Sequence, residues 1–135
     1  MGVFSGQLGD PNPVAFLAGN FTASGSMTWT VGSGDQTMFE YVSTGGFCRV
    51  RCNLVTTTVG GTPSTGLLIT IPNSLTSKEV VIVPFYYSDN GTTDCGYAST
   101  SVGGTLITLN KPAAANWSAS TDATAIFVDI SFRVN

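Results

Sequence analysis

The feature that most constrains this chain is an alternation of apolar and polar side chains that runs from Met27 to the C-terminus. Successive side chains of a strand point to opposite faces of a sheet, so this pattern predicts strands with one buried side. The alternation is cleanest in 123–134, where the predicted buried residues are Ile126, Val128, Ile130, Phe132 and Val134. No segment shows the helical stripe of apolar residues. The sequence therefore predicts an all-β fold.

Turn residues divide this region into about eight short segments, each of a length typical of strands. The predicted strands are 27–31, 36–43, 47–56, 67–71, 80–87, 95–100, 105–109 and 123–134. Antiparallel strands in this number predict a two-sheet sandwich, jelly-roll-like in topology, with a Greek-key sandwich of immunoglobulin-like connections as the alternative. Pro84 lies inside a predicted strand, so we expect an edge position or a bulge there.

Residues 1–26 differ from the rest and predict an extended, irregular N-terminal arm, followed by a β-sandwich domain over 27–135. The arm is rich in Gly, Pro, Asn and Ser, and its Asp-Pro-Asn-Pro stretch at 10–13 disfavours helix. It also holds more large apolar residues than disordered tails usually do, so we expect it to dock on a neighbouring protein. The predicted anchors are Phe4, Leu8, Phe16, Leu17 and Phe21.

The chain has three cysteines, Cys48, Cys52 and Cys95. Cys48 and Cys52 fall in one predicted strand at a separation of roughly 13 Å, which is too far for a disulfide. Either could pair with Cys95, but we favour buried free thiols, because free cysteine behaves as a small apolar residue. The Cys/His spacing of a zinc site is missing, so we predict no metal and no cofactor.

Ionisable groups are scarce, with no histidine, 10% charged residues and a net charge of −3. Most catalytic sites need a group that titrates near neutral pH or a nucleophile with a base beside it, so we predict that the protein is not an enzyme. The carboxylates nearest in sequence are placed as turn and polar-face residues usually are. These pairs are Asp35 with Glu40, Asp89 with Asp94, and Asp122 with Asp129.

Binding to nucleic acid or membrane is also not expected. The five basic residues are scattered, whereas phosphate binding needs them clustered. No apolar run approaches the roughly 20 residues that span a bilayer. The first ten residues lack the pattern of a signal peptide, so we expect synthesis in a cytoplasm.

Aromatic residues on otherwise polar strand faces predict a contact between subunits. Phe47 and Phe127 are the predicted interface residues of an oligomer. Exposed aromatic rings could instead bind sugar, with the core or a subunit interface as the alternative. The candidates for this role are Trp29, Tyr86, Tyr87, Tyr97 and Trp117.

Several motifs, taken in order, carry a resemblance to a known family. They are Met27-Thr-Trp-Thr-Val31, the Gly34-Asp35 turn, Val59-Gly-Gly-Thr-Pro63, Leu68-Ile-Thr-Ile-Pro72, Gly103-Gly-Thr105 and Asn116-Trp-Ser118. Over 27–134 this succession resembles the small β-sandwich domains of tailed-bacteriophage virion proteins. Such domains occur at the tips of tail fibres and as surface proteins of heads.

The resemblance implies a structural protein of the virion, assembled as a homotrimer, with no catalytic residues. Because a short arm precedes the sandwich, we expect a capsid decoration (cement) protein, made in the host cytoplasm and located on the capsid surface. It would bridge neighbouring subunits of the major capsid protein, with the arm in the groove between capsomers. The alternative is a receptor-binding tail-fibre tip that recognises a host surface glycan through the loops 57–66, 88–94 and 111–122.

Overall fold

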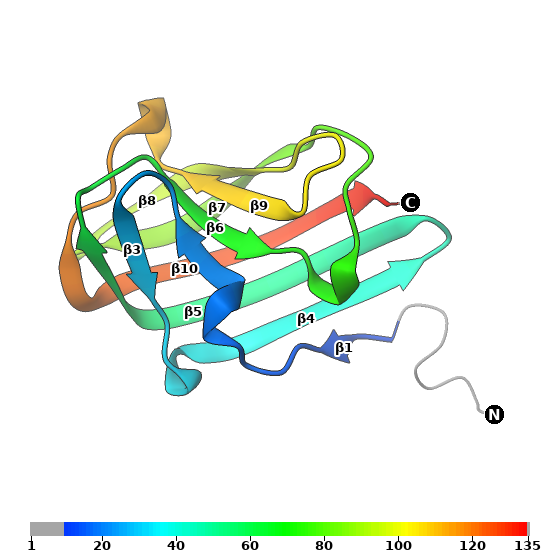
Figure 1. Cartoon of the computed structure of the whole chain (residues 1–135), viewed down its shortest axis with the longest axis horizontal. Coiled ribbons are helices and arrows are strands. Elements are labelled where there is room, and N and C mark those ends of the chain that lie inside the picture. Colours follow the sequence, from blue (N-terminus) through cyan, green and yellow to red (C-terminus); the bar gives the residue numbers. More distant parts are fainter. Residues whose placement is uncertain (1–9, 135) are drawn as a thin grey trace.

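The computed structural model describes residues 10–134, which form an all-β domain, as predicted (Figure 1). No α-helix occurs in this part of the chain, and four 3-10 turns join strands: η1 (Ala18–Asn20), η2 (Ser33–Asp35), η3 (Pro72–Ser74) and η4 (Pro112–Ala114). The ten strands are β1 (Asn12–Pro13), β2 (Phe21–Ala23), β3 (Met27–Thr30), β4 (Gln36–Thr44), β5 (Phe47–Gly61), β6 (Gly66–Thr70), β7 (Ile82–Asp89), β8 (Thr92–Ser99), β9 (Leu106–Asn110) and β10 (Ser120–Arg133).

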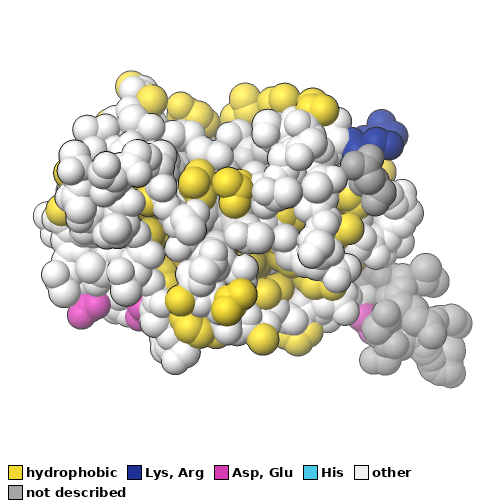
Figure 2. All heavy atoms as spheres, in the orientation of Figure 1, with side chains coloured by type: hydrophobic (Ala, Val, Ile, Leu, Met, Phe, Trp, Pro, Cys, Tyr) yellow, Lys and Arg dark blue, Asp and Glu magenta, His cyan; other side chains and the backbone are white. Residues whose placement is uncertain are grey.

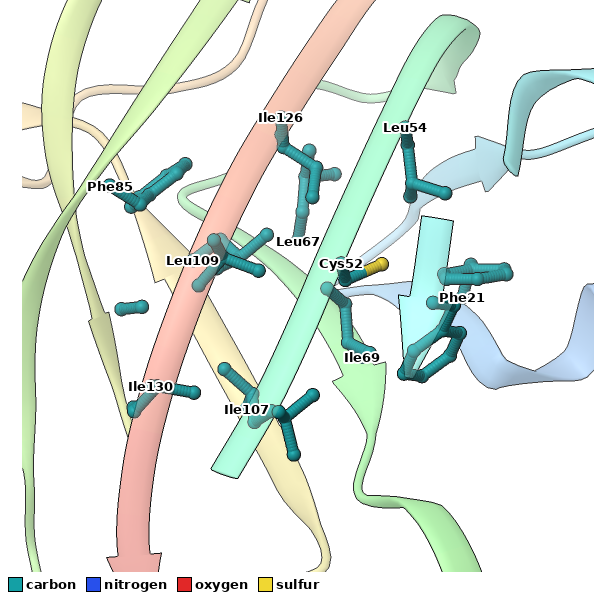
Figure 3. Close-up of a cluster of buried hydrophobic side chains, with 14 of the residues drawn as sticks. Phe21, Cys52, Leu54, Leu67, Ile69, Phe85, Ile107, Leu109, Ile126 and Ile130 are labelled. Carbon is teal, nitrogen blue, oxygen red and sulfur yellow. The ribbon is translucent and has the colours of Figure 1, made fainter. Parts of the chain in front are cut away.

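The strands form one antiparallel sheet in the order β1-β4-β5-β10-β7-β8-β9-β6-β2, with β3 paired to β5 beside this path. The sheet curls into a half-barrel, so that β5 and β10 lie across the core from β6 and β9 (Figures 1 and 3). The predicted sandwich of two separate sheets, and its jelly-roll topology, are not confirmed, because pairing of β7 with β10 joins all the strands into one sheet. Ten strands appear in place of eight, because the predicted arm supplies β1 and β2.

The arm is the largest difference between expectation and structure. Asn12 pairs with Tyr41 of β4, and Phe21 pairs with Ile69 of β6, so two short segments of the predicted arm are strands of the sheet. Phe21 is 3% exposed, and its ring centroid lies 5.6 Å from that of Trp29. These strands are too short to show an alternation that sequence could reveal. Phe4 and Leu8 lie outside the described residues.

The core follows the predicted alternation in the two longest strands. In β5 the side chains of Cys48, Val50, Cys52 and Leu54 are fully buried. In β10 the four residues predicted to point inward are all buried, and so is Val134 directly after the strand. Figure 3 shows side chains of β6, β9 and β10 gathered in one buried cluster, with Leu67, Ile69, Ile107, Leu109, Ile126 and Ile130 among them.

The predicted loop 57–66 is wrong in its first part, because β5 continues to Gly61 and pairs with β3. The reason lies in Thr57, which is fully buried although it is polar. Its hydroxyl accepts a hydrogen bond from Trp29 Nε1 at 2.9 Å and donates one to the carbonyl oxygen of Thr124 at 2.7 Å. A buried hydroxyl with both bonds made costs little, so a threonine-rich stretch can cross the core.

Pro84 explains where β7 separates from β10. The backbone N–H of Asn90 donates to the Ala123 carbonyl of β10. Counting back along β7 from Asn90, the backbone N–H and C=O groups of every second residue therefore point towards β10. Pro84 is the next such residue after Tyr86, and it has no N–H to donate. The ladder between the two strands accordingly ends at the pair Phe127 and Tyr86, while Pro84 still pairs with Tyr97 of β8. At Pro84, therefore, β7 has a neighbour on the β8 side only, which confirms the predicted edge position at this point of the strand.

All three cysteines are free, as favoured from the sequence. Cys48 and Cys52 are buried, whereas Cys95 is exposed, so the expectation of burial is wrong for Cys95. Cys95 pairs with Tyr86 and shares its outward face. Burial raises the pKa of the Cys48 thiol to about 11 and raises the pKa of Cys52 above its usual range as well.

A thiol reagent at pH 8 should therefore modify one cysteine per native chain and all three after unfolding. The thiolate is the reactive form, and the raised pKa values of Cys48 and Cys52 keep them protonated as well as inaccessible. Mass spectrometry of the modified chain counts the adducts. A Cys95→Ser variant should give no adduct in the native state, and native modification of Cys48 or Cys52 would contradict this packing.

Gly96 marks a close approach of β8 and β9. A Cβ at this position would overlap the carbonyl oxygen of Asn110 and lie 2.9 Å from a ring carbon of Phe85. Gly96→Ala should lower the free energy of unfolding by about 2–3 kcal/mol, because neither backbone nor buried ring can move away freely. Urea denaturation measures the change. Gly34→Ala, where no heavy atom lies within 4 Å, should change stability by less than about 0.5 kcal/mol; equal losses would show that the clash is relieved.

Candidate interaction surfaces

The most buried charged group of the described residues holds loops together. Asp89 is 2% exposed, and its Oδ2 accepts a hydrogen bond from Lys111 Nζ at 2.6 Å. Both carboxylate oxygens also accept from the backbone N–H of Ser118. The N–H of Trp117 donates to the Ser64 carbonyl at 2.9 Å. The three loops predicted for glycan recognition therefore meet at one end of the domain.

The other acidic residues of interest also make structural bonds. Asp35 accepts from the Gly32 N–H and the Thr56 hydroxyl, at 2.8 and 2.6 Å, and so holds η2 against β5. Asp122 accepts from the Thr58 hydroxyl at 3.2 Å. Within 10–134 no cluster of three or more His, Cys, Asp or Glu residues could hold a metal ion. In the same range, no helix has the length and apolar character needed to span a bilayer.

The outward side of β4, β5, β10 and β7 carries ordered rows of side chains, and we call it the outer face. Strand pairing places Met38, Asn53, Phe127 and Tyr86 in one row across these strands. The next row is made by Glu40, Arg51 and Asp129. Cross-strand neighbours on one face lie close enough to interact, so each row acts as a unit.

Ion pairs cross the outer face. Arg49 binds Asp129 through two hydrogen bonds, Nε to Oδ1 at 2.9 Å and Nη2 to Oδ2 at 2.6 Å. The hydrogen bonds from Arg49 hold the pKa of Asp129 below its usual range. Arg51 is held less closely, with its nearest nitrogens 3.6 Å from Glu40 and 3.9 Å from Asp129. The side chains of Arg49 and Asp129 are 54% and 47% exposed, so this ion pair contributes little to stability.

A hollow opens on the outer face where β7 leaves β10. Its volume is about 260 Å³. We call it the outer-face hollow, and its lining residues are Met38, Arg51, Asn53, Pro84, Phe85, Tyr86, Phe127, Val128 and Asp129. Tyr86 is 47% exposed, and its ring centroid lies 5.8 Å from that of Phe127. The hollow thus combines aromatic rings with a guanidinium, an amide and a carboxylate.

Phe47 and Phe127 lie on the outer face, but at separate places along it. Phe47 pairs with Arg133, which is six positions from Phe127 along β10, or about 20 Å. Phe47 is more than half exposed and lies at the same end as Val80 and Ile82, which are exposed to a similar degree. Arg133 links the two sides of this end, because its backbone bonds both Lys78 and Glu79. We call these three apolar residues the Phe47 end.

A second surface, around β2, β3 and η3, is almost free of charge. Figure 2 shows hydrophobic and uncharged polar side chains over most of this view, with charged ones at its margins. The largest hollow there, about 420 Å³, is lined by Val14, Asn20, Thr70, Ile71, Pro72, Asn73, Ser74, Leu75 and Thr105. A neighbouring hollow of about 270 Å³ is lined by Phe21, Thr22, Ala23, Met27, Thr28 and Trp29. We call the two hollows, with the adjoining Leu17, the charge-poor face.

The predicted anchors divide into two groups. Leu17 is 61% exposed and free to contact a partner. Phe21 lies in the core, so its prediction as a partner-binding anchor is wrong. Phe16 is half-buried, with its ring centroid 6.5 Å from that of Phe21. Phe16 and Phe21 therefore pack on the chain's own core, and docking of the segment on a neighbouring protein stays a prediction.

The aromatic candidates for sugar binding divide in the same way. Trp29, Tyr87 and Trp117 are core residues. Tyr97 is half-buried and Tyr86 is exposed, both on the outward side of the β7–β8 pair. No known protein family, characterised protein or solved structure matches the chain.

Proposed function

We propose that the chain is a non-enzymatic structural protein of a tailed-phage virion, a capsid decoration protein that bridges neighbouring copies of the major capsid protein. The observation that carries this proposal is the charge-poor face, with two adjoining hollows and an exposed leucine. Depletion of charged residues is typical of the buried centre of protein–protein interfaces. The motifs shared with phage virion domains supply the class of partner.

In this proposal the curled sheet is a variant of the jelly-roll sandwich of those virion domains, with its two layers joined through β7 and β10. Attachment buries Leu17 and fills the larger hollow with capsid side chains. Burying a leucine contributes about 1.5–3 kcal/mol, and Phe4 and Leu8 act as further anchors. A subunit that contacts two capsid proteins at once raises the free energy needed to separate them.

Self-association into a trimer belongs to the same proposal, and we place its contact at the Phe47 end. Phe47, Val80 and Ile82 are 56%, 62% and 65% exposed, an unusual concentration of large apolar side chains for a surface. Sedimentation velocity should show a trimer for the native chain and a monomer for the Phe47→Ser/Ile82→Ser variant. Leu17→Ser is the matched control, because it changes an apolar residue equally exposed elsewhere. A native monomer at micromolar concentration would contradict the trimer.

Co-sedimentation with heads tests the attachment. Heads of the phage that encodes the chain, assembled without it, are mixed with the purified protein and pelleted. We expect saturable binding at a fixed ratio, weakened at least tenfold by Leu17→Asp. Thr93→Asp places the same charge on the exposed β8 strand and should bind normally. Absence of binding, or equal binding by Leu17→Asp, would contradict attachment through the charge-poor face.

A receptor-binding tail-fibre tip is the second candidate, favoured by the convergence of the three loops around Asp89 and Lys111. Loops that a rigid sheet brings together at one end are a frequent location for recognition sites. In this case the purified protein binds host cells and not heads. The same labelled protein, applied to both in parallel, distinguishes the two functions.

A further inference from the structure

The outer-face hollow is formed by the strands of the sheet themselves. Pro84 stops the β7–β10 ladder at the pair Phe127 and Tyr86, and the strands diverge beyond it. Phe85 and Val128, both 3% exposed, line the hollow from below. The floor is therefore fixed by the core, and the shape of the hollow does not depend on a loop.

Aromatic rings form one wall of the hollow. Tyr86 and Phe127 are directly opposite each other in the strand pairing, with an angle of 38° between their ring planes. Tyr86 is nearly half exposed although it neighbours other apolar residues. Rings presented in this way offer an apolar face with a hydroxyl at its edge, which suits a ligand that is apolar on one side and polar at its rim.

The opposite wall carries polar groups that retain hydrogen-bonding capacity. In the described part of the chain, neither the guanidinium of Arg51 nor the side-chain amide of Asn53 makes a hydrogen bond. The closest approaches of Arg51 to carboxylates, 3.6 and 3.9 Å, exceed hydrogen-bond length. Asp129 bonds Arg49 with both oxygens, and each carboxylate oxygen has a further lone pair to offer.

We propose that the outer-face hollow binds a neutral hexose ring, with Tyr86 and Phe127 against its apolar face and Arg51 and Asn53 bonded to its hydroxyls. The volume of about 260 Å³ lies just below the usual range for drug-sized ligands and suits one sugar ring. Arg51 and Asp129 carry opposite charges, so the hollow favours no ionic ligand. An open, shallow site of this kind should bind with millimolar affinity.

The geometry argues against a peptide in the same place. An extended peptide added to a strand edge needs a run of backbone donors and acceptors. Pro84 removes the donor of β7 at the centre of the hollow. In the proposed trimer, a second copy contacts the Phe47 end, about 20 Å away, which leaves the hollow open. The proposal is independent of attachment to heads or tails.

Two-dimensional ¹H–¹⁵N NMR of the labelled protein tests the proposal. D-glucose, D-galactose and N-acetyl-D-glucosamine are titrated separately to tens of millimolar. We expect at least one sugar to shift amide signals of 51–53, 84–86 and 127–129 in a saturable way. Tyr86→Ser and Asn53→Ala should each weaken binding at least tenfold. Both residues lie on the surface of the sheet, so their spectra should otherwise match that of the native chain.

Val102→Ser is the control, because it removes an apolar side chain that is 71% exposed and does not line the hollow, and it should leave the affinity unchanged. Absence of saturable shifts with all three sugars would overturn the proposal. Shifts that persist unchanged in Tyr86→Ser would overturn it too, because binding would lie elsewhere. For a sugar that binds, its linear trisaccharide identifies the source: tenfold tighter binding supports a glycan chain, and equal affinity supports a free sugar.

Discussion

Replacing Trp117 with alanine should lower the free energy of unfolding by about 3–5 kcal/mol, as expected for a large aromatic residue in a well-packed core. Trp117 is fully buried and packs against Tyr87, with ring centroids 5.0 Å apart. Its Nε1 donates to the Leu109 carbonyl at 3.3 Å, so truncation also leaves a buried acceptor without its partner. Urea denaturation followed by circular dichroism measures the loss.

Trp117→Phe separates the two contributions, because it keeps an aromatic ring and removes the donor. We expect this variant to fall between alanine and the native chain. Tyr86→Ala is the control for loss of an aromatic ring at the surface and should cost less than about 1 kcal/mol. A loss at Trp117→Ala as small as that at Tyr86→Ala would mean that the loop 111–119 does not close the core.

Replacing Asp89 with asparagine should cost about 3 kcal/mol, the second largest effect expected. The side chain of Asp89 is 1% exposed and that of Lys111 is 18% exposed, so the ammonium loses its partner where water reaches it poorly. The Lys111 ammonium also lies 6.0 Å from the Trp117 ring centroid. The loops that meet at this end should therefore loosen together, which hydrogen exchange of their amides would detect.

A double-mutant cycle with Lys111→Met isolates the interaction. The double variant should be more stable than Asp89→Asn alone, because no unpaired charge remains. Asp129→Asn removes one partner of the exposed Arg49 pair and should cost less than about 1 kcal/mol. If Asp89→Asn and Asp129→Asn cost the same, burial of the Asp89–Lys111 pair does not matter for stability.

The long strands could be predicted because each buries one face. In β5 and β10 the inward and outward residues differ clearly in polarity, and their burial agrees with the prediction. Thr57 breaks this correspondence, since a hydroxyl bonded on both sides is as acceptable in the core as a methyl group. Sequence polarity therefore placed a loop where β5 continues.

Some strands depend on pairing with strands distant in the sequence, which the local pattern of residues does not reveal. Strands β1 and β2 are two and three residues long, and they exist only because β4 and β6 offer edges to them. In 80–87 both faces are apolar, so the pattern could not reveal that Val80, Ile82 and Tyr86 point outward. The outer-face hollow could not be predicted from the sequence for the same reason, although Pro84 correctly indicated a break in strand pairing.

The most direct test of the proposed cement function is the thermal stability of heads with and without the protein. Filled heads that lack the chain are heated in steps, and released DNA is measured by its sensitivity to nuclease. The account predicts release at a higher temperature when native protein saturates the heads, and no increase with Leu17→Asp. Release at an unchanged temperature with native protein bound would contradict a stabilising role.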